Sequence, residues 1–196
     1  MSSRTQQEAS MLRNTHNGIS RDTRQALVDL LNARLAAAID LRVQAKQAHW
    51  NLRGPRFIAL HELFDQVASA GSSFQDLLGE RVAQLGGYAA GTIEAVCASS
   101  SLATYPVELS READHVRCMT DALARFTASA RAGVSECENL EDVATADILT
   151  EITREADKLL WFVEAHLDER GLGGETRDIS SAQPAADGEA SENARH

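Results

Sequence analysis

Four stretches of the chain repeat their apolar residues with the spacing of an α-helix, and one long connection separates the second from the third. This period predicts amphipathic helices over about residues 22–50, 57–85, 110–134 and 145–171, with a tight turn at residues 51–56. The connection of residues 87–109 has no sustained period, apart from a short helix expected near residues 92–98, and can cross a bundle from end to end. The predicted fold class is therefore all-α, a four-helix bundle with a long crossover.

The expected helix ends define the domain boundaries. Asp22 is a candidate cap for the first helix, with Gln25 reaching back to it, and Ser110 for the third. Gly171 would end the fourth helix. A chain of 196 residues is long enough for one domain. We therefore expect a flexible N-terminal tail at residues 1–20, a bundle at residues 21–171, and a disordered acidic tail at residues 172–196.

The charge balance limits the partners of the protein. Its 29 acidic residues against 19 basic ones give a net charge of −10, which on average repels nucleic acid and anionic membranes and suits metal cations. Cys97, Cys118 and Cys137 are widely spaced, which favours free thiols in a reducing compartment over a disulfide framework or a zinc site. Because the N-terminus has no apolar leader and no run approaches a membrane span, we expect a cytoplasmic protein that does not bind membranes.

A set of histidines and carboxylates falls near the first turn and along the second helix. His61 and Asp65 are one helical turn apart, as are Asp76 and Glu80, and the 11 residues between Asp65 and Asp76 are close to a whole number of turns. All four residues therefore share one stripe of the helix. Histidine and carboxylates are the ligands of non-haem iron and of zinc. With His49, at the end of the first helix, they make up the candidate metal site.

One helix cannot bring both pairs to the same metal, because their centres are 15 residues, or about 22 Å, apart. Each pair is thus half of a site. A two-fold axis at the midpoint would place the first pair of one chain opposite the second pair of its copy. The midpoint falls in the run Ser-Ala-Gly-Ser-Ser of residues 69–73, whose small side chains suit a close helix crossing. His49, returning through the turn, would complete the half formed by His61 and Asp65.

Each of these features also has a simpler explanation. A single pair of polar residues one turn apart is usually a solvated helix face, and a histidine at a helix C-terminus can simply complement the helix dipole. Two pairs in register, with small residues at their midpoint, are much harder to obtain by chance. Glu112 and His115 form a Glu-x-x-His motif, but a di-iron centre within one bundle needs a second copy, so we interpret this one as a polar face near a helix start.

The stretch KQAHWNLRGPRFIALHELFDQVASAGSSFQDLLGERVAQLGG, residues 46–87, resembles the signature of Dps proteins, the DNA-binding proteins from starved cells. Weaker matches at residues 104–106, 146–150 and 158–162 extend the resemblance over roughly residues 20–170. It implies a ferritin-like four-helix subunit, a dimer-built hollow dodecamer, and a ferroxidase centre at the dimer interface. The ligand positions of that family match five residues of this chain: His49, His61, Asp65, Asp76 and Glu80.

By the same resemblance, Fe(II) would be oxidised at this centre, preferably by hydrogen peroxide, and Fe(III) would be stored inside the shell, so that the protein protects against oxidative stress. Zinc could compete for the site. Trp50 matches a family position beside the centre, where an indole can relay electrons, although a role in packing the dimer is equally consistent. Acidic residues between Glu136 and Glu151 could line a pore for cations or complement the dipole of the fourth helix.

A nucleoid-compacting DNA-binding protein with a secondary metal site is the alternative function, and a helical scaffold without chemistry is a third. Members of the family that bind DNA generally use lysine-rich tails. Here the N-terminal region carries Arg4, Arg13 and Arg21 against Glu8, and the segment after Gly171 has five acidic residues against two arginines. Few phosphate contacts are therefore available, and we expect DNA binding to be weak or absent.

Overall fold

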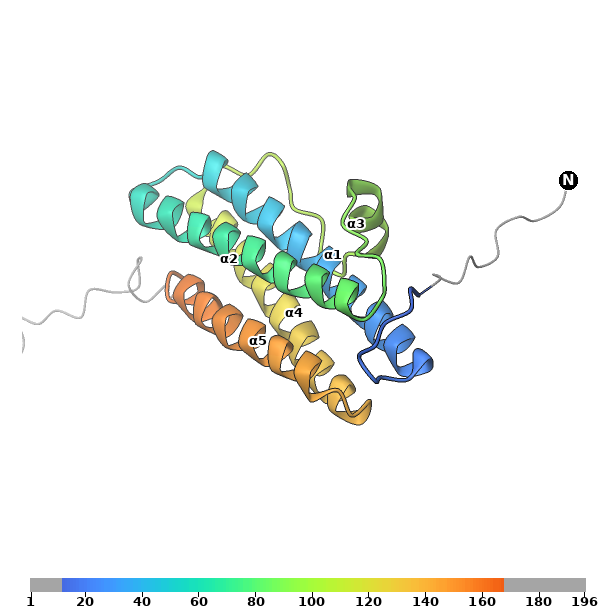
Figure 1. Ribbon diagram of the computed structural model, residues 1–196. Helices are drawn as coiled ribbons and strands as arrows, with labels where there is room; N and C mark the ends of the chain where they lie inside the picture. The colour runs from blue at the N-terminus through green and yellow to red at the C-terminus, as the bar shows by residue number, and fades with distance from the viewer. Residues whose placement is uncertain (1–11, 168–196) are drawn as a thin grey trace, which may run out of the picture.

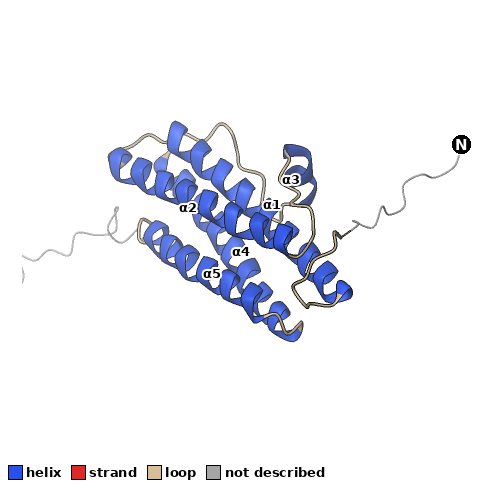
Figure 2. Cartoon of the chain, viewed as in Figure 1, coloured by secondary structure: helices blue, strands red, loops and turns tan. Residues whose placement is uncertain are grey.

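The computed structural model describes residues 12–167, and its regular structure in that range is helical (Figures 1 and 2). The helices are α1 (Arg21–Asn51), α2 (Phe57–Gln84), α3 (Ile93–Ser99), α4 (Glu112–Asn139) and α5 (Val143–Glu164). In this part of the chain the only strand-like pairing is one bridge between Arg53 and Arg111. The prediction of an all-α bundle with a short helix in the crossover is confirmed.

The four long helices form two hairpins, α1 with α2 and α4 with α5 (Figure 1). Contacts of α1 with α4 and of α2 with α5 close these pairs into a bundle. The crossover of residues 85–111 carries the chain from the end of α2 to the start of α4, and its helix α3 packs on α1. One side of α2 therefore remains at the surface of the chain along much of its length.

The core is built from the apolar side chains that the helical period singled out. Burying each large one contributes about 1.5–3 kcal/mol. Phe57, the first residue of α2, remains 37% exposed. Since each long helix keeps a polar side, no helix within residues 12–167 is long and apolar enough to cross a membrane. The largest fully buried side chains include Leu27, Leu31 and Leu41 of α1, Leu60, Phe64 and Leu78 of α2, Met119, Leu123 and Phe126 of α4, and Leu149 of α5.

The first two expected caps are wrong. Ser20 caps α1, its hydroxyl accepting the backbone N–H of Thr23 at 3.1 Å, while Asp22 lies in the first turn, where it complements the helix dipole. Ser110 does not cap α4, which begins after Arg111 without a side-chain cap. The reason is that the carbonyl of Ser110 accepts the N–H of Arg53 and holds this residue in the bridge between the two turns.

The last long helix also differs from its expected bounds. Asp142 caps α5, which starts at Val143, slightly before the expected residue 145. It ends at Glu164 instead of continuing to Gly171, because the backbone turns there: Leu167 N–H bonds to the carbonyl of Glu164 at 2.8 Å. Gly171 itself lies outside the described residues.

Residues 12–20 lie against the bundle. The backbone N–H of Arg13 donates to Gly86 O at 2.8 Å. The buried guanidinium of Arg24 donates to the carbonyls of Arg13 (3.1 Å) and Leu85 (2.9 Å), and so ties this segment to the end of α2. Residues 12–20, which the prediction placed in the flexible tail, are therefore bound to the bundle, while residues 1–11 are not described. That segment and the predicted acidic tail of residues 172–196 lie outside the described residues.

Candidate metal centre

Two histidines from consecutive helices face each other at the turn between α1 and α2. His49 lies in the last turn of α1 and His61 near the start of α2. Their rings stack with centroids 3.6 Å apart and planes inclined by 19°. The ring of Phe57 stacks on His61 in turn, with centroids 5.0 Å apart. Phe57 was not among the predicted site residues, although its spacing of four residues from His61 is the signal for this contact.

Each histidine bonds to the backbone of the other. Nδ1 of His49 lies 2.8 Å from the carbonyl oxygen of His61, and Nδ1 of His61 lies 2.9 Å from that of His49. A carbonyl can only accept, so in both rings Nδ1 carries the proton and donates it. In the neutral form of each ring, this arrangement leaves the lone pair on Nε2, which is the state that a metal ion requires.

The turn that brings the two histidines together is held by an ion pair from a distant helix. Gly54 has φ 155°, and a Cβ at this position would lie 2.2 Å from the Glu112 carboxylate. That carboxylate accepts the backbone N–H of Arg56 at 3.1 Å and its Nε at 2.8 Å. Burial raises the pKa of Glu112, but these hydrogen bonds outweigh it and leave the pKa below its ordinary value. Arg56 also donates to the carbonyl of His166 at 3.0 Å, which joins the end of α5 to the turn.

Asp65 follows His61 by one turn and is exposed at the surface of α2. Its Oδ1 accepts a hydrogen bond from the ammonium of Lys46, which lies three residues before His49 on α1. This hydrogen bond is the main reason that the pKa of Asp65 lies below its ordinary value. The carboxylate is thus ionised, with a protein cation on one of its oxygens. Lys46 was not among the predicted site residues, although its place on the same side of α1 as His49 was a usable signal.

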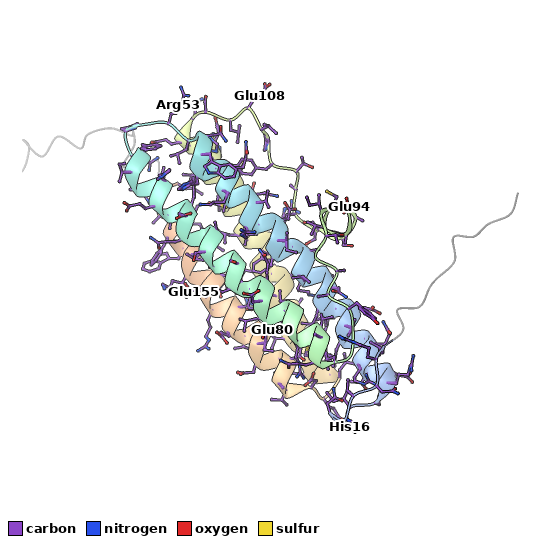
Figure 3. The ribbon with its side chains drawn as sticks, turned by 45° about the horizontal axis from the view of Figure 1, so that its top comes forward. His16, Arg53, Glu80, Glu94, Glu108 and Glu155 are labelled. Atoms are coloured by element: carbon purple, nitrogen blue, oxygen red, sulfur yellow. The ribbon has the colours of Figure 1, made fainter. Side chains whose placement is uncertain are left out.

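Asp76 and Glu80 lie one turn apart near the other end of α2, both exposed, and Figure 3 labels Glu80 on this helix. Neither makes a hydrogen bond or an ion pair with another residue in the described range. Within residues 12–167, no three His, Cys, Asp or Glu residues come close enough together to hold one metal ion. One chain therefore brings His49, His61 and Asp65 to one end of α2, and Asp76 and Glu80 to the other.

The end of α2 next to Glu80 has its own anchor. Arg81 donates two hydrogen bonds to Asp142, at 3.0 and 2.8 Å, and one to the Thr145 hydroxyl at 2.8 Å. Burial raises the pKa of Asp142, but the hydrogen bonds from Thr145 and Arg81 hold it below its ordinary value. This network fixes the end of α2 against the start of α5, and the residue just before Arg81, Glu80, stays at the surface.

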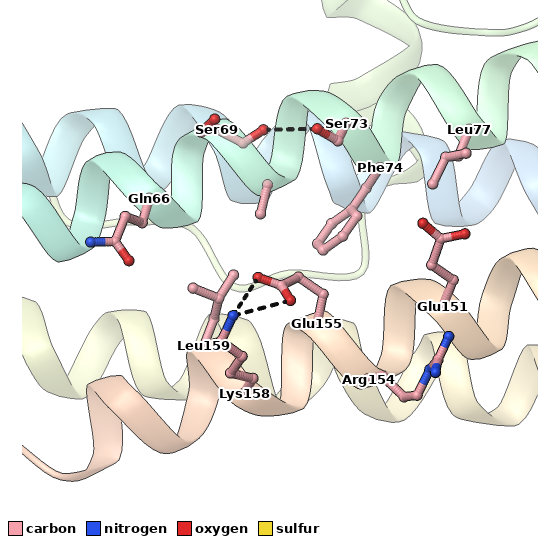
Figure 4. Close-up of a pocket in the computed structure, with 11 residues that line it drawn as sticks. Gln66, Ser69, Ser73, Phe74, Leu77, Glu151, Arg154, Glu155, Lys158 and Leu159 are labelled. Atoms are coloured by element: carbon pink, nitrogen blue, oxygen red, sulfur yellow. Dashed lines mark hydrogen bonds and ion pairs between the residues drawn. The ribbon is translucent and has the colours of Figure 1, made fainter.

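The midpoint between the two carboxylate pairs is partly open. Ser69 and Ser72 are exposed on the stripe that carries the candidate ligands. Gly71 instead faces inward, where a Cβ would lie 3.0 Å from the Cβ of Arg42 on α1. Beside the stripe, a groove of about 730 Å³ runs between α2 and α5, with Ser73 and Phe74 on one side and Arg154 and Lys158 on the other (Figure 4).

The remaining candidates have distinct positions. Trp50 is 67% exposed, directly after His49. The interpretation of Glu112 and His115 as a polar face is wrong, because His115 is only 1% exposed and bonds to Tyr105. In the acidic segment, Glu136 pairs with Arg34 and Asp142 with Arg81, so Asp142 at least has a structural role. A cation pore in this segment stays a prediction.

Comparison with known families and structures gives a consistent result. The sequence model of the ferritin-like domain family matches residues 28–171 of this chain. The DNA protection during starvation protein of Agrobacterium fabrum is 38% identical over 156 residues, which cover 80% of this chain and 96% of the relative. The protein of the same name from Mycolicibacterium smegmatis is 30% identical over 169 residues, covering 86% of this chain and 91% of the relative.

Solved structures agree with the sequence comparison. DpsA14 from Streptomyces coelicolor superposes with a TM-score of 0.77 at 33% identity, covering 83% of this chain and 96% of its own. The tetragonal form of Mycobacterium smegmatis Dps gives a TM-score of 0.77 at 30% identity, with 82% and 97% covered. The fold, the length of the match and the level of identity together show that the chain belongs to the Dps family of ferritin-like proteins.

Proposed function

We propose that the protein oxidises Fe(II) at sites shared between two copies of the chain, and stores the Fe(III) inside a closed homo-oligomeric shell. The observation that carries this proposal is the reciprocal bonding of His49 and His61, whose Nδ1 atoms donate to each other's carbonyls at 2.8 and 2.9 Å. Two neutral imidazoles with Nε2 free, beside an ionised Asp65, form half of an iron site.

The other half comes from the second copy. Asp76 and Glu80 lie about 22 Å from the histidine end along α2, too far to bind the same ion in one chain. An antiparallel copy of α2, related by a two-fold axis near residues 69–73, would bring them opposite His61 and Asp65. The exposed hydroxyl-bearing residues at this midpoint, Ser69 and Ser72, are small enough for a close crossing. Each dimer would then carry two identical sites, and six dimers would form the dodecameric shell of the family.

The histidines and the carboxylates would have different roles at such a site. His49 and His61 supply neutral nitrogen ligands, while the three carboxylates supply negative charge that stabilises Fe(III) more than Fe(II). Where the metal takes the Asp65 oxygen that Lys46 now bonds, one cation replaces another. Two Fe(II) ions give one electron each to one hydrogen peroxide, which takes up two protons and becomes two waters. When both electrons are delivered from the same site, no hydroxyl radical is formed.

Protection of DNA, which the names of the relatives describe, would follow here from the removal of iron and peroxide. The net charge of −10 and the scarcity of lysine leave few groups for phosphate contacts. We expect no retention of DNA in a gel-shift assay at about 0.15 M salt. A shift of the metal-free protein that disappears on deletion of residues 1–20 would instead support the nucleoid-compacting alternative.

An anaerobic titration with Fe(II), followed by hydrogen peroxide, tests the proposal directly. Binding is followed by calorimetry, Fe(III) formation by absorbance, and hydroxyl radical by spin trapping. We expect saturable binding, fast oxidation and little trapped radical, with Zn²⁺ competing for the same sites. His61→Ala should lose binding, whereas His16→Ala, which changes an exposed histidine near the N-terminus, should not. Equal behaviour of the two variants would show that iron binds elsewhere.

A further inference from the structure

A buried phenol–imidazole pair lies where the crossover meets α4. Tyr105 is 9% exposed and His115 is 1% exposed. The hydroxyl of Tyr105 lies 2.7 Å from Nδ1 of His115. On the far side of the ring, Nε2 lies 3.0 Å from the carbonyl oxygen of Leu109. The proposed iron site uses none of these three residues.

The bonding pattern fixes where the protons are. The carbonyl of Leu109 can only accept, so Nε2 of His115 carries a hydrogen and donates it. Nδ1 then holds a lone pair, and the Tyr105 hydroxyl must donate to it. Burial raises the pKa of Tyr105 and lowers the pKa of His115, so both groups are neutral at physiological pH. The result is a buried phenol with its proton already directed at a neutral base.

This arrangement matters for one-electron chemistry. Removing an electron from a phenol makes its O–H proton strongly acidic, so the oxidation is easy only if a base takes the proton in the same step. Nδ1 of His115 is such a base at hydrogen-bond distance. The imidazolium that forms keeps its bond to Leu109, and the bundle shields the phenoxyl radical from solvent.

Helix α1 connects the surroundings of the pair to the end that carries His49. Tyr105 shares a small cavity of about 60 Å³ with Gln44 of α1 and Cys118 of α4. Gln44 donates to the carbonyl of Ala103 at 3.0 Å and so fixes the approach of the crossover to α1. His49 follows Gln44 by five residues, a rise of about 7.5 Å along the helix. An electron passing between the pair and the iron site would therefore have to cross the packed protein along α1 without direct contact between the groups.

We infer that Tyr105, with His115 as its proton acceptor, is a one-electron donor that quenches hydroxyl radical formed at the iron site. This inference rests on the proposed function, which supplies the oxidant when peroxide receives one electron instead of two. The electron of Tyr105 reduces hydroxyl radical to hydroxide, and the phenol proton moves to Nδ1 of His115. A further Fe(II) then returns an electron to the phenoxyl and becomes Fe(III), while the proton moves back to the oxygen.

The chain provides its own control, because Tyr88 is its only other tyrosine. Tyr88 is 60% exposed, and its ring lies under the guanidinium of Arg13, 5.1 Å from the centroid. A hydrogen bond from its hydroxyl to a base is absent among the described residues. If simple access to oxidant decided which phenol reacts, Tyr88 would be oxidised first. If a hydrogen-bonded base decides which phenol reacts, Tyr105 would be oxidised first.

The test uses the full chain and freeze-quench electron paramagnetic resonance. Iron-loaded protein is mixed with peroxide, and the neutral tyrosyl radical is quantified in wild type, Tyr105→Phe and Tyr88→Phe. In parallel, iron-free protein is oxidised with a photogenerated ruthenium(III) complex, which tests the pair without the iron site. His115→Gln keeps a polar side chain but removes the base. Thermal melts report whether each variant is folded.

We expect the radical in wild type and Tyr88→Phe with both oxidants, its loss in Tyr105→Phe, and at least a tenfold lower yield in His115→Gln. A radical that persists in Tyr105→Phe and disappears in Tyr88→Phe overturns the inference, as does a yield that His115→Gln leaves unchanged. If the photochemical oxidant produces the Tyr105 radical but iron and peroxide do not, the link to the iron site is wrong. Failure of the proposed function shows separately, as absence of Fe(III) formation.

Discussion

The two ends of α2 carry different parts of the candidate site and are built in different ways. At the N-terminal end of α2, hydrogen bonds already orient the candidate ligands. His49 and His61 each bond to the other's backbone carbonyl, and the ammonium of Lys46 bonds to the carboxylate of Asp65. At the C-terminal end, Asp76 and Glu80 lie at the surface without such partners among the described residues. The first end is a set of candidate ligands oriented by other residues, and the second is a pair of carboxylates on a rigid support.

Both ends are nevertheless fixed by an arginine–carboxylate pair from another helix. Arg56 and Glu112 hold the turn at the start of α2, and Arg81 and Asp142 hold its last turn. The second pair is the more buried, with side-chain exposures of 13% and 7%, against 25% and 13% for the first. A helix fixed at both ends keeps a constant distance between the two halves. A site shared across a two-fold axis depends on that distance.

The largest effect on iron oxidation is expected when one half of the proposed shared site loses a ligand. His61→Ala and Asp76→Ala should each lose most of the iron oxidation, although the residues lie at opposite ends of α2. Dimers with one variant in each chain should recover about half of the wild-type activity, since the two-fold axis puts both defects into one site and none into the other. Differently tagged chains, co-expressed and purified as mixed dimers, provide the material. Absence of recovery in intact mixed dimers would contradict shared sites.

The anchor at the C-terminal end should give the largest effect on stability. Asp142→Asn removes the charge that Arg81 faces in a mostly buried position, which should cost about 3 kcal/mol of unfolding free energy. Asp157→Asn is the matched control, because its pair with Arg131 is exposed at 46% and 59% and should contribute less than about 1 kcal/mol. Denaturant unfolding measures both. A similar loss in the two variants would mean that burial does not distinguish these pairs.

The anchor at the N-terminal end can be tested through its glycine. Gly54→Ala should lower the unfolding free energy by about 1–3 kcal/mol, because of its positive φ and because the new Cβ would meet Glu112. Since the same turn places His49 against His61, Fe(II) affinity should fall as well. Gly91→Ala is the control, as its Cβ would meet Ile39 at 3.4 Å, an ordinary contact. A stable Gly54→Ala with normal iron binding would separate the turn from the site.

The difference between the two ends also shows what the sequence could reveal. The common stripe of His61, Asp65, Asp76 and Glu80 follows from helical geometry, which depends only on spacing within one element. The position of His49 near His61 needed one more step, namely the tight turn between the two helices. Both are local, and both could be derived from the residues.

The anchors could not be predicted in this way, because they join residues far apart in the chain. Arg81 and Asp142 are 61 residues apart, and Arg56 and Glu112 are 56 apart. Nothing in the local pattern of an arginine or a glutamate indicates which distant partner it meets. The cap at Ser20 was missed for another reason, since Ser20 and Asp22 are both good capping residues and packing of the preceding segment decided between them.

A smaller effect is expected from the cation beside the half-site. Lys46→Met should raise Fe(II) affinity by up to about fivefold, because the metal no longer has to displace an exposed ion pair that contributes at most about 1 kcal/mol. Asp65 should stay ionised at pH 7 without this partner, since an ordinary aspartate is ionised there. Lys158→Met, which removes the exposed pair with Glu155, is the control for charge alone. Weaker binding in Lys46→Met would mean that the ammonium positions Asp65 for the metal.

The two ends should also respond differently to acid, though with the smallest effect. His166 lies beside Arg56, near the N-terminal end of α2. Its pKa lies below the ordinary value of 6.5, mainly because the ring is partly buried and secondly because the positive charge of Arg56 is near. A histidine that binds its proton less well when folded stabilises the fold above that value, so this contribution declines as the pH falls below about 6.5. Asp142, whose pKa is held below 3.8, keeps its contribution until the pH falls below that value.

Between about pH 6.5 and 4.5, local opening at the N-terminal end of α2 should therefore become easier, while the stability of its C-terminal end stays unchanged. Hydrogen exchange, corrected for the intrinsic effect of pH and read on peptides from the two ends, can separate them. His49 and His61 lie at the same end, so the contribution of His166 is the part that His166→Gln removes. Equal loosening of both ends, or a profile that His166→Gln leaves unchanged, would show that the turn does not depend on a neutral His166. Equal loosening would also mean that the anchors at the two ends respond alike to acid.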